Sequence, residues 1–98
     1  MPTFIGMVSY GNSGGKSGPA ELGVAKGARA WTDANGGRIL SIYWTGGDPD
    51  MVVAFEGRDE DQASRAFKDL EAQHGVSIHM VRGLTEGEKE RALQGKSV

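Results

Sequence analysis

The sequence predicts an α+β fold in which four strands and two helices follow the order β-α-β-β-α-β. Three observations support this prediction: four short apolar runs, two stretches of helical periodicity between them, and turn-forming glycine, proline and aspartate at the boundaries. The expected strands are residues 3–10, 38–45, 50–56 and 76–82, and the expected helices are residues 19–35 and 59–74. A chain of 98 residues has room for one hydrophobic core, so we expect a single domain over residues 1–98.

Large apolar side chains stand on both faces of the first expected strand. Phe4, Val8 and Tyr10 share one face, and Ile5 and Met7 share the other, because successive side chains of a strand point to opposite sides of the sheet. The pattern indicates that both faces of this strand are covered in the native protein.

The first helix is expected to begin near Pro19, which suits the first helical turn, and to end before Gly36-Gly37. Gly23 and Gly27 lie inside this helix, where each costs about 1 kcal/mol relative to alanine. Two interpretations remain open for this pair: plain tolerance, or close packing of the helix against a strand or a neighbouring subunit.

The second and third strands are expected to pair as an antiparallel hairpin, because a loop of about five residues joins them. Alternation along the second strand predicts one face with Leu40, Ile42 and Trp44, and an opposite face with Ile39, Ser41 and Tyr43. Along the third strand, the same rule sets Met51, Val53 and Phe55 against Val52 and Ala54.

The second helix has a clear amphipathic stripe with an expected start at Asp59 or Asp61 and an end at Gly75. Its apolar positions follow helical spacing at Ala63, Ala66, Phe67 and Leu70. The fourth strand alternates Val76, Ile78 and Met80 with Ser77, His79 and Val81. Thr85 and Glu88 form a capping box, which predicts a short C-terminal helix to about residue 94.

This order of elements is that of the ferredoxin-like fold, in which two helices cover one face of a four-stranded antiparallel sheet. The second face is expected to carry residues from the sets Ile5/Met7, Ile39/Tyr43, Val52/Ala54 and His79/Val81, or from the alternate set of each strand. A second copy of the chain is the natural cover for such a face. We therefore expect a homodimer that packs sheet against sheet.

Composition excludes several classes of function. The net charge is −2 and no basic stripe is present, so nucleic acid is not an expected partner. The absence of cysteine excludes disulfides and thiolate metal sites and fits a reducing compartment. No signal peptide or membrane span is recognised, so a cytoplasmic location without membrane contact is expected. No cofactor and no metal are expected.

Several ordered segments resemble the GYD domain family. They are Met1-Pro2-Thr3-Phe4-Ile5, Gly15-Lys16, Gly36-Gly37-Arg38-Ile39, Gly47-Asp48-Pro49-Asp50-Met51-Val52-Val53 and Arg82-Gly83-Leu84-Thr85. The resemblance covers nearly the whole chain, but Pro49 stands where the family has its signature tyrosine. The resemblance to this family implies the dimeric α/β-barrel arrangement, in which two ferredoxin-like chains pack sheet against sheet. Muconolactone isomerases, quinone-forming monooxygenases and heme-handling proteins share that arrangement, and borrowing their activities is fold analogy alone.

The candidate site residues are His79 and Asp50 as catalytic groups, and Tyr10, Lys16, Tyr43 and Trp44 as ligand-binding groups. Lys16 lies within the glycine-rich loop of residues 11–18, which lacks P-loop spacing, so it would attract an anionic group without hydrolysing a nucleotide. The aromatic residues would enclose an apolar body, and His79 or Asp50 would move a proton.

Two of these assignments also have a purely structural interpretation. His79 also fits a structural histidine, and its face depends on strand register. Asp48, Pro49 and Asp50 also fit a turn in which aspartate accepts backbone N–H groups.

Three functions remain open at this stage. The first is a homo-oligomer that binds a small, partly apolar molecule between sheet and helices. The second is a cofactor-free isomerase or monooxygenase, and the third is a structural or assembly protein without a ligand.

Overall fold

The fold was described from a computed structural model covering residues 1–10 and 18–95, and its element order confirms the predicted fold class. In this part of the chain the elements are β1 (Thr3–Ser9), α1 (Gly18–Asn35), β2 (Arg38–Trp44), β3 (Met51–Glu56), α2 (Glu60–His74), β4 (Ser77–Gly83) and α3 (Glu86–Leu93). The strands form one sheet in the order β2-β3-β1-β4, with every neighbouring pair antiparallel. This is the ferredoxin-like topology.

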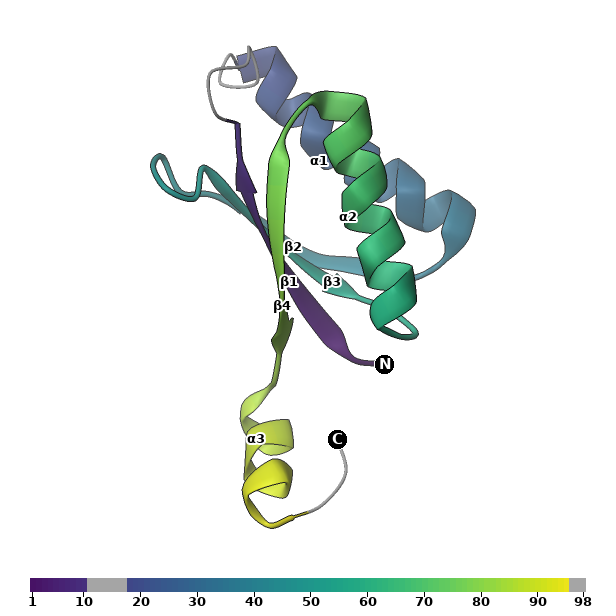
Figure 1. Ribbon diagram of the computed structural model, residues 1–98, viewed down its shortest axis with the longest axis vertical. Coiled ribbons are helices and arrows are strands. Elements are labelled where there is room, and N and C mark those ends of the chain that lie inside the picture. Colours follow the sequence, from purple (N-terminus) through teal and green to yellow (C-terminus); the bar gives the residue numbers. More distant parts are fainter. Residues whose placement is uncertain (11–17, 96–98) are drawn as a thin grey trace.

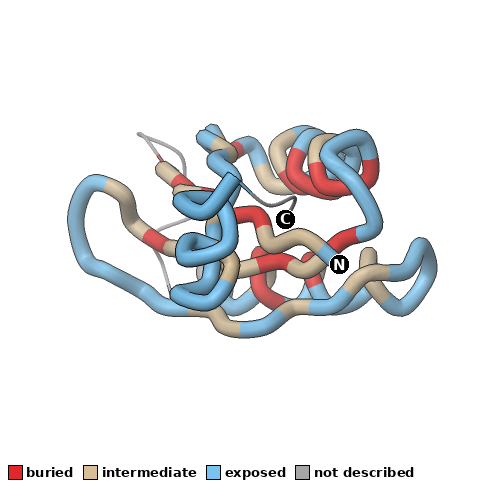
Figure 2. The backbone as a smooth tube through the Cα atoms, turned by 90° about the horizontal axis from the view of Figure 1, so that it is seen from below, coloured by how far each residue is buried: buried red, intermediate tan, exposed pale blue. Residues whose placement is uncertain are grey.

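Both long helices pack on the same face of the sheet (Figure 1). Helix α1 contacts β2 and α2, whereas α2 contacts β4 and β1. The buried residues gather between the helices and the sheet (Figure 2). The largest fully buried side chains are Phe55, Met51, Val8, Val24 and Val53. Phe55 packs edge-on against Phe67 of α2 and Trp31 of α1, which ties both helices to β3.

Local sequence signals explain where the helices begin and end. The Asp59 carboxylate caps α2 by accepting the Gln62 N–H at 2.9 Å, and Gly75 ends the helix in the left-handed conformation at φ 64°. The predicted capping box of α3 is also present, with Thr85 and Glu88 bonded to each other's backbone N–H groups.

One prediction for β2 was wrong. A bulge between Ile39 and Ser41 shifts the register against β3, so that Ile39 opposes Phe55 and Ile42 opposes Val53. Ile39 and Ile42 therefore both pack against the core, although strict alternation had placed them on opposite faces. Leu40 takes the extra position and is 43% exposed.

The two glycines inside α1 have different surroundings, which answers the question left open by the sequence. A Cβ on Gly27 would lie 2.6 Å from His74 Nε2 and 3.3 Å from Leu70 Cδ2, both on α2. A Cβ on Gly23 would meet nothing within 4 Å. Close packing therefore explains Gly27, but its partner is α2 and not the strand that the sequence had suggested, whereas Gly23 meets no other described part of its own chain.

Neither helix covers the second face of the sheet, which we call the open sheet face. It is formed by the alternate residues of the strands, chiefly Ile5, Met7, Val52, Ala54, Val81, Tyr43 and His79. Helix α3 does not cover this face, because it extends beyond the end of β4, away from α1 and α2 (Figure 1). None of the residues of α3 is buried.

Candidate functional site

His79 lies on the open sheet face, which resolves the question of register that the sequence left open. It opposes Met7 of β1, Met7 opposes Val52 of β3, and Val52 opposes Tyr43 of β2. His79 and Tyr43 therefore occupy the two ends of one row across the sheet, with apolar residues between them. Neighbouring strands are about 4.8 Å apart, so roughly 14 Å separates the two ends of the row.

Tyr10 and Asp50 hold the end of the sheet together and belong to the folded framework. Tyr10 is 2% exposed, its backbone N–H donates to Asp50 Oδ2 at 2.8 Å, and its hydroxyl lies 3.4 Å from Met51 Sδ. The backbone of Asp50 also bonds to Val8 and Thr45. The structural interpretation of Asp50 therefore fits the contacts around it: its carboxylate accepts a backbone N–H beside a turn.

The remaining predicted site residues do not converge. Tyr43 is 62% exposed on the open sheet face, whereas Trp44 is 43% exposed and opposes Met51 on the helix-covered side. Lys16 lies outside the described residues. His79 and Asp50 are not brought together either, since His79 is in the middle of β4 and Asp50 bonds to Tyr10 beyond the end of β1. The predicted site residues that the structure describes, Tyr10, Tyr43, Trp44, Asp50 and His79, form no single cluster.

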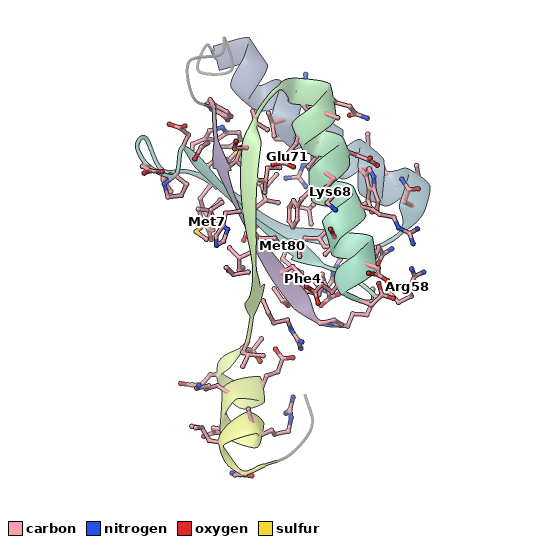
Figure 3. All side chains as sticks on the ribbon, viewed as in Figure 1. Phe4, Met7, Arg58, Lys68, Glu71 and Met80 are labelled. Atoms are coloured by element: carbon pink, nitrogen blue, oxygen red, sulfur yellow. The ribbon has the colours of Figure 1, made fainter. Side chains whose placement is uncertain are left out.

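A cleft that the sequence did not predict lies where the start of β1, the end of β4, the start of α2 and the start of α3 meet. Its volume is about 550 Å³, which is in the range of small-molecule sites. The apolar lining consists of Met1, Pro2, Phe4 and Met80, and the charged lining of Arg58, Asp59, Glu60, Arg82 and Glu88. We call it the arginine cleft. Figure 3 shows Phe4 and Met80 between the sheet and the first turn of α2, with Arg58 beside that turn.

Arg82 is the side chain of this cleft whose position and N–H donors best suit an anion. It opposes Phe4 across the β1–β4 pair, and its guanidinium carbon lies 5.9 Å from the centre of the Phe4 ring. A cation over an aromatic face is held there by the quadrupole of the ring. In the described part of the chain, Arg82 forms no salt bridge, so its N–H donors remain available to a ligand.

Two of the acidic groups are already bound at helix ends. The Gln62 N–H, and after it Arg58, hold the pKa of Asp59 below its ordinary value. The Thr85 N–H does the same for the pKa of Glu88, with smaller contributions from the Thr85 hydroxyl and from Arg82 and Arg91. Hydrogen bonds to a carboxylate favour its ionised form. Both acids are therefore ionised caps whose oxygens are oriented toward their own helices.

The cleft was missed because its residues come from four separate places in the sequence. Phe4 and Met80 fit the pattern of ordinary core-facing strand positions, and the charges at 58–61 and 86–91 fit solvated helix faces. The one signal available was an arginine at position 82, in the core-facing register of β4 set by Ile78 and Met80. A cation at such a position indicates that this end of the face is open.

Over residues 1–10 and 18–95, no group of three histidine, aspartate or glutamate side chains is arranged to hold a metal ion. None of the helices in the described ranges is long and apolar enough to cross a membrane.

Comparison with known proteins identifies the family to which the chain belongs. No curated protein matched the sequence. The family model described as GYD domain matches residues 4–93, which include every strand and helix of the ferredoxin-like unit and α3. The match agrees with the resemblance carried by the sequence segments, and the departure at Pro49 lies inside the matched range. The chain therefore belongs to the GYD domain family.

Proposed function

We propose that this protein works as a homodimer in which two open sheet faces pack against each other, and that each chain binds a small, partly apolar molecule. The observation that carries the proposal is the open sheet face itself. Ile5, Met7, Val52 and Ala54 are only half-buried there, although they occupy the two central strands of the sheet. Apolar side chains gathered on one exposed face are typical of an interaction surface.

The chemistry of the open sheet face favours a second copy as its cover. Its central rows are apolar, and the charges of Arg38 and Glu56 at one end already pair with each other at 3.2 Å. A surface of this kind offers no net charge for an oppositely charged partner to match. Every copy presents the same apolar rows, so a two-fold axis through the face makes it self-complementary.

A dimer also compensates for the small size of the core. A chain of about 100 residues buries roughly 60–65% of the surface that its unfolded form exposes, which gives modest stability. Full burial of one large aliphatic side chain contributes about 1.5–3 kcal/mol, and the half-buried residues of the open sheet face have part of that gain left. Packing of two sheets about 10 Å apart would bury these residues fully and add the rest of this free energy.

The catalytic form of the proposal, a cofactor-free isomerase or monooxygenase, has less support. It would depend on His79 alone, because Asp50 is bonded to Tyr10 and does not face His79. Two copies of His79 would lie within the interface, where a proton-transfer group needs a substrate beside it. We therefore propose ligand binding without a reaction.

A pair of lysine substitutions tests the dimer. Val52→Lys introduces a charge into the central row of the open sheet face, and Ala72→Lys introduces the same charge on the exposed side of α2. Light scattering after size exclusion is expected to give dimers for the natural chain and Ala72→Lys, and monomers for Val52→Lys. Circular dichroism checks that both variants fold. A folded Val52→Lys that remains dimeric would show that the interface lies elsewhere.

An assembly role is the second candidate, and α3 is the observation that favours it. An isolated helix of eight residues is marginal in water, yet α3 has no buried residue and Leu93 is 76% exposed. A neighbouring dimer could bind this helix and extend the assembly. In that case Leu93→Glu would reduce discrete higher oligomers to dimers, and a natural chain that never exceeds a dimer would contradict the assembly role.

A further inference from the structure

We propose that the arginine cleft binds a monocarboxylate with a compact apolar body. The carboxylate would lie on Arg82 and Arg58, and the apolar body on Phe4, Met80 and Pro2. The inference rests on the proposed small-molecule role and extends it by naming the site and the chemical class of the ligand. Of the expected site residues that the structure describes, none lines this cleft.

Arg82 provides the primary contact. Its guanidinium carbon lies 5.9 Å from the centre of the Phe4 ring, and this cation–π contact favours a position at the edge of the cleft. A planar guanidinium matches a carboxylate with two parallel N–H···O bonds, which are stronger than neutral hydrogen bonds. Phe4 is only 3% exposed, so the partly buried Met80 and Pro2 provide most of the apolar floor beside Arg82. A ligand with a carboxylate beside a hydrocarbon body would contact both Arg82 and this floor.

Arg58 is the second cation, and a buried glutamine fixes its backbone. The Gln62 side chain is 6% exposed, and its Oε1 accepts the Arg58 backbone N–H at 2.6 Å. Its Nε2 donates to the Asn35 carbonyl at the end of α1, at 3.0 Å. The Arg58 Nε–H donates to Asp59, which leaves the terminal guanidinium nitrogens for a ligand.

The acidic residues of the cleft restrict the charge of the ligand. Asp59 and Glu88 are ionised helix caps, and Glu60 adds a third carboxylate to the lining. The α-amino group of Met1 also belongs to the lining, so two arginines and this group balance three carboxylates and leave no net local charge. A phosphate dianion would bring two negative charges beside three carboxylates, whereas a monocarboxylate brings only one and meets less repulsion.

The lining also requires an apolar body. A carboxylate alone would gain little from two exposed arginines in water, because exposed ion pairs contribute about 1 kcal/mol or less. Burial of the ligand's own hydrocarbon surface against Met80 and Pro2 adds the remaining free energy at about 25 cal/mol per Å². We therefore expect benzoate to bind more tightly than either acetate or benzamide, which each lack one of the two features.

The test is a titration of the full chain with benzoate, followed by amide chemical shifts in ¹H–¹⁵N spectra. Benzoate is expected to shift residues around Phe4, Arg58 and Met80, while acetate, benzamide and inorganic phosphate bind at least about 10-fold more weakly. Arg82→Gln is expected to weaken benzoate binding about 10-fold or more, with Arg82→Lys between the two. Arg29→Gln, which removes an exposed arginine of α1, is the matched control and should bind like the natural chain.

Three results would overturn the inference: no saturable shifts with benzoate, phosphate binding as tight as benzoate binding, or equal losses in Arg82→Gln and Arg29→Gln. Sedimentation of the same samples separates this outcome from failure of the dimer. A dimer that retains a cell-derived ligand after Arg82→Gln would contradict the arginine cleft and leave the proposed function intact. A monomer that binds benzoate through Arg82 would support the cleft and contradict the dimer.

Discussion

Asp59 shows how a single side chain sets a pH dependence. The Gln62 N–H and Arg58 lower the pKa of Asp59 in the folded chain below the value of 3.8 that it has without these partners. The unfolded chain therefore takes up this proton at a higher pH than the folded chain. The stabilisation is complete above the unfolded pKa and is lost as the pH falls through the lower folded pKa.

Asp59→Asn keeps an oxygen that can cap α2 but removes the titration. The midpoint of thermal unfolding should therefore fall less between about pH 5 and about pH 2 in Asp59→Asn than in the natural chain. Asp33→Asn removes an exposed carboxylate of α1 and is the matched control. An acid dependence that is the same in all three proteins would contradict the role of Asp59.

The two glycines of α1 form a matched pair. Gly23→Ala should raise the free energy of unfolding by up to about 1 kcal/mol, because alanine favours the helix and the added Cβ meets nothing within 4 Å. Gly27→Ala should not give this gain, because its Cβ would lie 2.6 Å from His74 Nε2. Urea unfolding measures both variants.

A third substitution isolates the contact between the helices. In a His74→Ala background, Gly27→Ala should recover much of the gain seen for Gly23→Ala, because the obstructing ring is gone. If Gly27→Ala stabilises the natural chain as much as Gly23→Ala does, α1 and α2 are not as close at this position as the structure shows.

At the scale of elements, the helices could be predicted in more detail than the strand faces. The N-caps of α2 and α3 bond to groups within one helical turn, so the local sequence is enough to predict where these helices begin. The bulge in β2 is different. It is visible only in the register against β3, and no glycine marks it, since Leu40 takes the extra position. Strict alternation therefore placed Ile39 on the wrong face.

The bulge predicts opposite outcomes for two residues that alternation would place together. Leu40→Lys should change the free energy of unfolding by no more than about 0.5 kcal/mol, because Leu40 is 43% exposed. Ile42→Lys should cost more than about 2 kcal/mol, because Ile42 packs against the core and would bury an unpaired charge. Equal losses in urea unfolding would mean that Leu40 and Ile42 share a face after all.

At the scale of the whole molecule, the sequence could predict the fold but not the arginine cleft. The order of elements and the two-faced strands are repeated patterns, so they survive errors of one residue at each boundary. The cleft depends on Phe4 and Arg82 being opposite each other, and on the first turn of α2 lying beside them. Those distances follow from sheet order and helix packing, which no local pattern contains.

The candidate residues of the sequence separated for the same reason. Tyr10 has the same alternation as the buried residues Phe4 and Val8, so its side chain is also buried. There its hydroxyl lies against Met51, and its backbone N–H donates to Asp50. His79 follows the opposite alternation and lies on the open sheet face. Tyr10 and His79, both predicted to belong to one site, thus lie on opposite sides of the sheet, and a site that contains His79 would have to form on the open sheet face.

Native mass spectrometry of the protein purified from cells is the most direct test of the proposal that the open sheet face pairs two copies. The proposal predicts a mass of two 10.4 kDa chains, with reproducible additional mass wherever a ligand has been retained. A dimer without additional mass would support the interface and leave the ligand to the benzoate titration. A single chain mass at every protein concentration would contradict the homodimer, since the apolar rows of the open sheet face would then remain exposed to water.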